Sequence, residues 1–573
     1  MLFRNILSLT LMALSLNNIA AREVNVTILE TTDMHGNFFP RDFINARSAD
    51  GSLARVATLV DSLRSRHSNI VLLDNGDILQ GQPTAYYYNF VDTATSHPVA
   101  RMLNFLGYDA ASMGNHDVET GHDVYDRYRT ALGTTPLLGA NVIDTATGQP
   151  YLTPYTVVER DGLRIAILGM LTPSIPAWLP ENLWSGLRFD DMVATASHWI
   201  PIIREKEQPH IIVGLFHSGK DSSVITGGMM ENASLEVASK VPGFDVIFFG
   251  HDHKPHADYT DGVAVINPGA HAAAVGAADI TVTLDADGNV TAKSVTPRVI
   301  PVTQLEPDER FMNEFSTEMK TISDFVDRRV AESTDTLSLR DAYFGPSSFM
   351  TLIHDLQLAI SGADISFAAP LTMDATIAAG PVRINDMFKL YKYENLLYTI
   401  RLSGREIKDY LEESYDKWIQ TMTSPDDHLL RFASSGDAAK GDYARLKNPS
   451  YNFDSAAGIV YTVDVTRPRG ERITIISMAD GTPFDADKDY KVAVNSYRAN
   501  GGGDLLTRGA GIPLNQLKSR ILTATDKDLR FYLMKEIERR GVIEPRVDSC
   551  WKFIPEQIAA PAALRDRAIL FGR

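Results

Sequence analysis

The sequence predicts a layered α/β domain followed by a second domain of mixed helices and strands. Short runs rich in Val and Ile recur through the first half of the chain, and each ends in a polar or glycine cluster. Most of these runs lack an alternation of apolar and polar residues, which indicates strands buried on both faces of a sheet. Helix-compatible stretches separate them, as in layered α/β domains. The runs occupy residues 24–29, 70–73, 110–113, 165–168, 211–216, 246–249 and 263–266.

The composition is that of a globular protein. With 573 residues, 44% of them hydrophobic and 22% charged, the chain has room for about three domains, and it is neither disordered nor fibrous. The 55 Lys and Arg residues against 72 Asp and Glu give a net charge of −17, which lacks the basic surface that duplex nucleic acid requires. The single cysteine, Cys550, excludes an intrachain disulfide and a metal site built from several cysteines.

Residues 1–21 predict a cleaved signal peptide. Arg4 gives a positive start, residues 6–16 are mostly apolar, and Ala20 and Ala21 are small residues suited to cleavage. A membrane anchor is the alternative, but the apolar run has about a dozen residues where a bilayer requires roughly 20. No later stretch is long and apolar enough for a membrane span. We therefore expect an exported protein, periplasmic or secreted, with no membrane span.

The first domain is expected to span residues 22–303. Residues 53–63 and 191–200 predict helices, and Pro201 is expected to end the second one. Near the end of the domain, residues 280–284 and the run from Val290 onward predict a β-hairpin. Asp287 and Gly288 supply its turn, because this dipeptide favours tight hairpin turns.

A connecting helix is expected within residues 304–335, because apolar side chains recur there at helical spacing. The second domain is then expected at residues 336–550, and residues 551–573 at the C-terminus are interpreted as an extension. Within the second domain, Ser403 and Glu406 form a predicted capping box at the start of a helix. Residues 459–465 and 492–494 predict strands. The apolar positions of the connecting helix are Phe311, Phe315, Met319, Ile322 and Val326.

Polar side chains follow five of the predicted strands of the first domain. Open α/β sheets bind ligands outside the carboxyl ends of their strands, so we expect these side chains to converge. A glycine lies within a residue or two of each cluster and allows the backbone to turn tightly. The candidates are Asp33, His35, Asp77, Asn115, His116, His217, His251 and His253.

These residue types predict a metal site. Histidine, aspartate and one asparagine suit Zn, Mn or Fe. None of the candidates is a cysteine, which excludes a metal selected by thiolates. Leaving His116 aside, seven candidate ligands are too many for one tetrahedral zinc, but they suit two divalent cations that share a carboxylate. Two such cations are typical of in-line attack on a phosphoryl group. Any one of these clusters alone would most often be an ordinary turn or helix cap. Five such clusters, each at the end of a predicted strand, indicate a shared site instead.

The five motifs resemble those of the calcineurin-like metallophosphoesterases. They are Asp-x-His at residue 33, Gly-Asp at 76, Gly-Asn-His-Asp at 114, His-Ser-Gly at 217 and Gly-His-Asp-His at 250. This resemblance implies a four-layer α/β/β/α domain. It also implies one metal held by Asp33, His35, Asp77 and His253, and a second held by Asp77, Asn115, His217 and His251, so that Asp77 bridges.

The same resemblance implies a mechanism. A metal-bridged hydroxide would attack the phosphate in line, and His116 would face the phosphate and assist departure of the leaving group. Many relatives carry an aspartate three residues after that histidine, and it orients the ring. This chain has Glu119 there, one methylene longer, so whether the two residues form a dyad stays open.

The second domain resembles the C-terminal domain of secreted 5′-nucleotidases and 2′,3′-cyclic-nucleotide phosphodiesterases. The likeness lies in residues 388–403 and 495–504. It implies that Tyr393 and Tyr497 hold the nucleobase between their rings, since aromatic stacking binds any base. The alternative is that both tyrosines belong to the core. Residues of the following glycine-rich loop are expected to complete the substrate site, and these are Asn500, Gly501, Gly502 and Asp504.

One segment separates the two branches of that resemblance. The 5′-nucleotidases carry an Asn-Gly-Gly-Gly-Ile-Arg stretch that contacts the nucleotide, whereas residues 367–374 here read Phe-Ala-Ala-Pro-Leu-Thr-Met-Asp. We therefore expect a 2′,3′-cyclic-nucleotide 2′-phosphodiesterase and 3′-nucleotidase first. A 5′-nucleotidase is the second hypothesis. A UDP-sugar or sulfur-oxidation relative and a non-enzymatic nucleotide-binding protein come after these, and the sequence indicates no oligomeric state.

Overall fold

The first domain contains two six-stranded sheets that pack face to face. The computed structural model describes residues 22–433 and 446–572, so the expected signal peptide lies outside the described residues. The first sheet has the order β18-β17-β1-β4-β5-β6. Strand β1 pairs in parallel with β4, and in the antiparallel sense with the predicted hairpin of β17 and β18. The bounds are β1 (Arg22–Thr31), β4 (Ile70–Asp74), β5 (Ala110–Ser112), β6 (Leu137–Leu138), β17 (Ala274–Leu284) and β18 (Val290–Pro301).

The second sheet has the order β15-β16-β14-β11-β9-β8, and its four middle strands are parallel. These strands are fully buried over most of their length, as the unalternating apolar runs predicted. The bounds are β8 (Tyr155–Arg160), β9 (Leu163–Leu171), β11 (Ile211–His217), β14 (Val246–Phe249), β15 (His256–Thr260) and β16 (Val263–Asn267).

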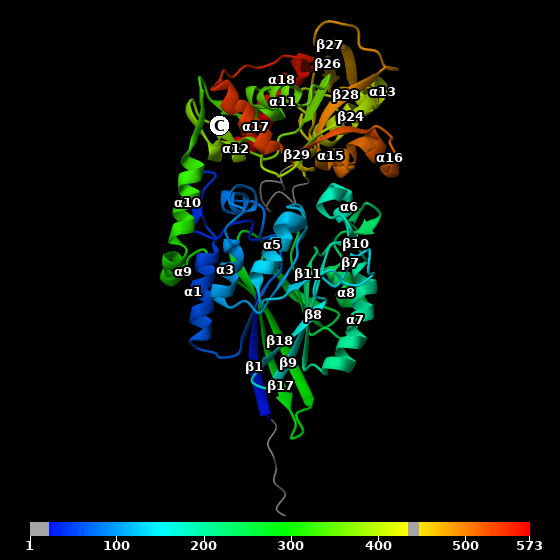
Figure 1. The fold of residues 1–573 in the computed structure, drawn as a ribbon. Coiled ribbons are helices and arrows are strands. Elements are labelled where there is room, and N and C mark those ends of the chain that lie inside the picture. Colours follow the sequence, from blue (N-terminus) through cyan, green and yellow to red (C-terminus); the bar gives the residue numbers. More distant parts are fainter. Residues whose placement is uncertain (1–21, 434–445, 573) are drawn as a thin grey trace, which may run out of the picture.

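Helices cover the outer face of each sheet and complete the four layers that the resemblance implied (Figure 1). One apolar cluster joins the two sheets, with Ile28 and Val71 on one side and Ile167 and Val213 on the other. Separate clusters join each sheet to its helices. The helices are α1 (Leu53–Arg64), α3 (Pro98–Leu106) and α5 (His122–Leu132) on the first sheet, and α7 (Met192–Glu207) and α8 (Ser234–Lys240) on the second.

The prediction that Pro201 ends a helix was wrong, because α7 continues through it to Glu207. The buried face of α7 carries Ile200 and Ile203, whereas Pro201 points to solvent. The apolar face is therefore continuous on both sides of the proline. Packing of that face against the sheet outweighs the backbone hydrogen bond that a proline removes.

Two short helices, rather than one, occupy the expected connecting segment. They are α9 (Glu309–Glu314) and α10 (Ser316–Asp327), and the backbone leaves helical geometry at Phe315. Phe311 and Phe315 pack against Phe105 of α3, so the connection is held on the first domain. Strand β19 (Arg329–Ser333) pairs with β23 (Gly380–Arg383) and β30 (Val542–Ile543). The strands of the second domain therefore begin within the segment expected to be linker.

The second domain is built on a five-stranded sheet of order β25-β21-β28-β24-β29. The predicted capping box is confirmed at the start of α13 (Gly404–Trp418), where Ser403 and Glu406 each accept a hydrogen bond from the other residue's backbone N–H. Helices α11 (Ser348–Ser361) and α17 (Leu529–Arg540) also contribute to the core. The strands are β21 (Ile365–Ala368), β24 (Leu396–Ser403), β25 (Ser455–Ala457), β28 (Asp489–Asn495) and β29 (Ile521–Asp528).

The C-terminal segment differs from the expected extension, because it is part of the second domain. Strand β31 (Trp551–Ile554) pairs in parallel with β26 (Ile459–Asp464), which also pairs with β27 (Ile473–Met478). Trp551 is buried and stacks on Tyr461. The following helix α18 (Glu556–Phe571) contributes Ala559 and Ala562 to the same core.

The two domains face each other across the carboxyl ends of the strands of the first domain (Figure 1). Lys518 forms an ion pair with Glu181, and the Tyr86 hydroxyl donates to Asp528, so contacts cross between them. Within the described parts of the chain, none of the helices has the length and apolarity needed to cross a bilayer.

Candidate active site

The predicted metal ligands lie on loops that leave the strands in strained geometry. Asp33, His35, Asp77, His251 and His253 all have φ between 47° and 73°, a region that non-glycine residues seldom adopt. Such residues cost of order 1–3 kcal/mol each and cluster at functional sites. The strain is therefore concentrated in five of the seven candidate ligands.

Two glycines allow these loops to approach each other closely. A Cβ atom at Gly114 would lie 2.2 Å from the Asp77 Oδ1 atom, and one at Gly250 would lie 2.6 Å from Asp33 Oδ2. Any side chain at either position would displace a candidate ligand. Glycine at these positions in the sequence is thus a requirement of the site.

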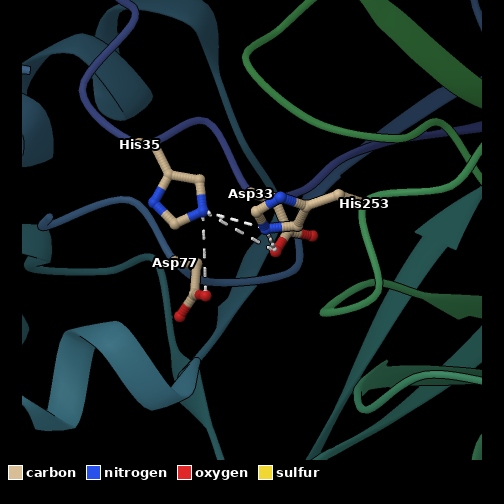
Figure 2. A group of neighbouring side chains, drawn as sticks. All are labelled: Asp33, His35, Asp77 and His253. Atoms are coloured by element: carbon tan, nitrogen blue, oxygen red, sulfur yellow. Dashed lines mark hydrogen bonds and ion pairs between the residues drawn. The ribbon is translucent and has the colours of Figure 1, made fainter. Parts of the chain in front are cut away.

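Four of the candidates form a compact cluster, shown in Figure 2. Asp33, His35, Asp77 and His253 each offer one ligand atom, and these atoms all lie within 4.8 Å of one another. His253 Nε2 lies 3.1 Å from both His35 Nε2 and Asp33 Oδ1. These are the four residues that the resemblance assigned to the first metal.

The other candidates gather on the far side of Asp77. His217 Nε2 lies 3.2 Å from Asp77 Oδ2 and 3.2 Å from Asn115 Oδ1. The same Asn115 oxygen lies 2.8 Å from His251 Nδ1. Asp77 Oδ2 also lies 4.0 Å from His35 Nε2, so this one oxygen faces both groups. The structure brings all seven candidate ligands together in two sets that share Asp77.

The chemistry of these atoms fits a divalent cation. Asp33 Oδ1 and Asp77 Oδ2 are buried, and neither has a hydrogen-bond donor in suitable geometry within residues 22–433 and 446–572. Burial alone would raise the pKa of Asp33, but His253 and His217 outweigh it and hold that pKa below its usual range. Burial would lower the pKa of His217, but Asp77 and Asp33 raise it to about 10. Buried carboxylates of this kind require a compensating positive charge.

Three of the histidines are oriented by hydrogen bonds on the side away from the clusters. His35 Nδ1 lies 3.2 Å from the carbonyl oxygen of Gln80, and His217 Nδ1 lies 2.6 Å from that of Asn75. His251 Nε2 lies 3.0 Å from Glu231 Oε1. Each ring can therefore donate to its partner and turn its other nitrogen toward the cluster, as metal-bound histidines do.

Asp117, the last residue of the Gly-Asn-His-Asp motif, was assigned no role from the sequence, but it holds the loops together through backbone hydrogen bonds. Its carboxylate accepts backbone N–H bonds of 2.9 Å from both Gly114 and Asp77, and two more from Ile78 and Leu79. Burial and the nearby Asp77 raise the pKa of Asp117 to about 6. Asn75 and Gln80 flank Asp77 in sequence, which is the only signal that could have identified them. Glu231 lies in a distant hairpin and carried no such signal.

His116 and Glu119 form a close pair at the edge of the site. His116 Nδ1 lies 2.5 Å from Glu119 Oε2, and the backbone N–H of His116 donates to Asp77 Oδ1 over 2.7 Å. Burial alone would lower the pKa of His116, but the Asp77 and Glu119 carboxylates raise it to about 9. The longer glutamate side chain therefore reaches the histidine.

A cavity of about 590 Å³ connects this edge to the second domain. Its wall on the first domain includes Asn115, His116, Glu119 and His251. All six expected substrate-binding residues lie on its other wall, and these are Tyr393, Tyr497, Asn500, Gly501, Gly502 and Asp504. The two sets are far apart in sequence, and the fold places them on one cavity.

The ring of Tyr497 is fixed from behind. A Cβ atom at Gly502 would lie 2.4 Å from this ring, so only glycine allows the loop to pass there. Tyr451, which also lines the cavity, meets Tyr497 edge to face at 6.2 Å. Arg498 ties the wall together, because it donates to the backbone carbonyls of both Tyr451 and Gly502. Sequence reasoning assigned no role to Tyr451.

Two known domains match the chain on either side of the connecting helices. Residues 26–255 match the calcineurin-like phosphoesterase family, and residues 329–508 match the 5′-nucleotidase C-terminal domain. The chain thus combines a calcineurin-like phosphoesterase domain with a 5′-nucleotidase C-terminal domain. Members of this family are metal-dependent hydrolases of phosphoric esters.

Proteins of similar sequence align with this chain over both of its domains. It is 28% identical to a 2′,3′-cyclic-nucleotide 2′-phosphodiesterase/3′-nucleotidase of Salmonella typhimurium, over 95% of this chain and 91% of that protein. It is also 28% identical to the trifunctional nucleotide phosphoesterase protein of Bacillus subtilis, over 94% of this chain but only 39% of that longer protein. A putative 5′-nucleotidase of Staphylococcus aureus shares the fold, with a TM-score of 0.76 at 22% identity over 92% of this chain and all of that one.

The shared carboxylate leads to a prediction about metal content. We expect Asp77→Asn to reduce bound divalent metal well below that of the wild type, because an amide cannot supply an anionic oxygen to both clusters. Elemental analysis after dialysis against Mn²⁺ or Zn²⁺ measures this loss. Asp287→Asn, at the exposed tip of the β17–β18 hairpin, is the matched control and should bind as much metal as the wild type. Full metal retention in Asp77→Asn, with near-normal turnover, would contradict the ligand assignment.

Proposed function

We propose that the phosphoesterase is an exported enzyme that hydrolyses nucleotides, with 2′,3′-cyclic and 3′-nucleotides as preferred substrates. The observation that carries this proposal is the single cavity that joins the metal-ligand clusters to an aromatic wall on the second domain. A phosphate placed beside His116 and His251 would leave room for its nucleoside along Tyr393 and Tyr497. Residues 1–21 are proposed as the export signal.

The two ligand sets would hold two divalent cations, of Zn, Mn or Fe. Asp33, His35, Asp77 and His253 would hold one, and Asp77, Asn115, His217 and His251 the other. When bound, such cations neutralise phosphate oxygens and make water a nucleophile near neutral pH. Oxygen and imidazole donors suit all three metals, so the donor set does not select among them.

His116 is proposed as the acid that protonates the leaving alcohol. Its Nδ1 atom faces Glu119, which leaves Nε2 as the nitrogen available to a substrate in the cavity. Glu119 stabilises the protonated ring and fixes its orientation. The backbone bond from His116 to Asp77 ties the position of this acid to that of the shared carboxylate.

The aromatic wall is proposed to bind the base. Tyr393 and Tyr497 are partly exposed at the cavity, so part of each ring is free to contact a ligand. Stacking contributes about 1–3 kcal/mol per base in single-strand binders and tolerates any base. Asp504 and Asn500 lie beside the rings and offer polar groups to the ribose.

The preference among nucleotides rests on the segment at residues 367–374. Leu371 of this segment lines the cavity, at the part of the chain where 5′-nucleotidases carry a glycine run and an arginine. An apolar side chain there offers no charge to a nucleotide. The relatives that match over nearly their whole length include 2′,3′-cyclic-nucleotide 2′-phosphodiesterase/3′-nucleotidases, which agrees with this preference. A 5′-nucleotidase remains the second hypothesis.

A panel of substrates tests the proposal. With Mn²⁺ present, we expect hydrolysis of 2′,3′-cyclic AMP and 3′-AMP at rates well above that of 5′-AMP. Chromatographic separation of the products and an assay of released phosphate measure these rates. Removal of metal by a chelator should abolish all three activities. Turnover of 5′-AMP alone would show the 5′-nucleotidase hypothesis to be right, and no turnover of any of the three would refute the nucleotide assignment.

The base wall gives a second prediction. We expect Tyr497→Ala to raise KM for 3′-AMP by about tenfold, since it removes one stacking surface. Turnover of 4-nitrophenyl phosphate, which has no base, should change little. Tyr259→Ala, on an exposed strand away from the cavity, is the control and should affect neither substrate. Equal loss on both substrates would count against a stacking role.

The His116–Glu119 pair gives a prediction about pH. Glu119 helps raise the pKa of His116 to about 9, so Glu119→Gln should lower that pKa. An acid with a lower pKa loses its proton at lower pH, and the alkaline limb of kcat should therefore move to lower pH. Asp126→Asn, which removes the carboxylate beside His122 outside the cavity, is the matched control. An unshifted alkaline limb in Glu119→Gln would argue against His116 as the acid.

A further inference from the structure

The cavity has an apolar wall that the nucleotide-binding residues do not use. On the first domain, Trp178 and Leu179 line it from the end of α6 (Ile175–Trp178), and Ile225 lines it from β12 (Ile225–Thr226). The side chain of Ile225 is 58% exposed, which is unusual for a large apolar residue at a cavity. Exposed apolar side chains that gather around a concave site indicate a binding surface.

Trp178 lies directly beside the metal-ligand clusters. Its ring centroid is 5.7 Å from that of His251, with an interplanar angle of 31°. Trp178 is half-buried, and within residues 22–433 and 446–572 its indole N–H donates to no protein group, so a ligand in the cavity could accept from it. One part of the ring packs on the core and the rest faces the cavity. The side chain therefore presents an unused aromatic surface and an unused donor.

The segment that carries Trp178 is anchored by packing and by a hydrogen bond. Leu179 is buried, and its carbonyl oxygen accepts a hydrogen bond of 3.0 Å from the Trp184 indole. Ile225 is held through its neighbour, because Thr226 hydrogen-bonds to Glu231, which in turn binds His251. A ligand bound on this wall would thus contact a surface that is linked by hydrogen bonds to His251, one of the candidate metal ligands.

The cavity therefore has two aromatic surfaces on different domains. Tyr393 and Tyr497 belong to the second domain, whereas Trp178 belongs to the first and lies beside His251. A phosphate at Asn115, His116 and His251 that sends its nucleoside toward the tyrosines leaves Trp178 free for another substituent. A phosphomonoester has no such substituent, but an acyclic phosphodiester does.

We propose that Trp178 and Ile225 form a second subsite, which binds an aromatic or apolar group esterified to the substrate phosphate. This inference rests on the proposed function and extends its substrates to acyclic nucleoside phosphodiesters. In the reaction, the oxygen of water bonds to phosphorus, and the bond from phosphorus to the second alcohol's oxygen breaks. That alcohol leaves with a proton, and a nucleoside monophosphate remains. The product is then itself a substrate of the proposed nucleotidase activity.

Paired deoxynucleoside substrates test the subsite. Thymidine 3′-(4-nitrophenyl phosphate) carries an aromatic second group, thymidine 3′-(methyl phosphate) carries a small one, and thymidine 3′-phosphate carries none. We expect Trp178→Ala to lower kcat/KM for the aryl diester about tenfold more than for either of the other two. Trp178→Phe should recover most of the loss, because a ring is restored. Ile225→Ala should act in the same direction with a smaller effect.

Two controls separate a subsite from a structural role. Trp199 lies on α7 and packs against Tyr155, away from the cavity. Trp199→Ala should therefore leave kcat/KM for all three substrates unchanged. Metal content of Trp178→Ala should equal that of the wild type, which shows that His251 is undisturbed. Equal losses on all three substrates, or no loss on the aryl diester, would overturn the inference.

Assays of the wild-type enzyme distinguish a failure of this inference from a failure of the proposed function. Hydrolysis of thymidine 3′-phosphate without hydrolysis of the aryl diester would overturn the second subsite and leave the nucleotidase proposal intact. No hydrolysis of any of these substrates, together with none of 3′-AMP or 2′,3′-cyclic AMP, would refute both.

Discussion

The site depends on one buried carboxylate and on the loop that holds it. Asp77 faces both ligand clusters through Oδ2, and its other oxygen accepts the backbone N–H of His116. Its own backbone has a φ of 54° and donates to Asp117, which also holds Gly114. Both ligand sets and the proposed acid are therefore positioned by one residue. A shift of this loop would move all of them together, and tight packing against Gly114 opposes such a shift.

The buried carboxyl groups near Asp77 fall into two pairs whose pKa values shift in opposite directions. Asp33 and Asp77 lie among histidines, and their pKa values are lowered despite complete burial. Glu30 and Asp74 lie behind them at the ends of β1 and β4, and burial raises the pKa values of both. The histidines thus favour the anionic form of the front pair, whereas burial disfavours the anionic form of the rear pair. The opposite directions of these shifts favour negative charge where cations are proposed to bind, and oppose the costly burial of four charges side by side.

The sequence predicted that the candidate ligands converge, because a general property of parallel sheets determines where they lie. The carboxyl ends of β1, β4 and β5 in one sheet and of β11 and β14 in the other lie at the same end of the two packed sheets, so the residues that follow these strands converge. No comparable rule predicts the residues that act on the site through backbone hydrogen bonds or tertiary contacts. Glu231 reaches His251 from a remote hairpin, and Tyr451 meets Tyr497 only through the fold of the second domain.

The same distinction explains the errors in the fold. Pro201 was expected to end a helix because local propensity was considered without the buried face that continues past it. Residues 551–573 were interpreted as an extension because their prolines are visible in the sequence, whereas the pairing of β31 with β26 is not. In both cases long-range packing decided the outcome. Local patterns do not contain that information.

The position of the base wall relative to the metal ligands is set by packing between the domains. Arg530 is buried in the second domain, where it pairs with Glu394 and donates to the carbonyls of Tyr391 and Lys392, next to Tyr393. Its guanidinium also lies 5.0 Å from the ring of Tyr86, which belongs to the first domain. Breaking such a buried pair is strongly destabilising. The loop that carries Tyr393 is thereby linked through Arg530 to Tyr86 of the first domain, and this contact helps to position the base wall opposite His116.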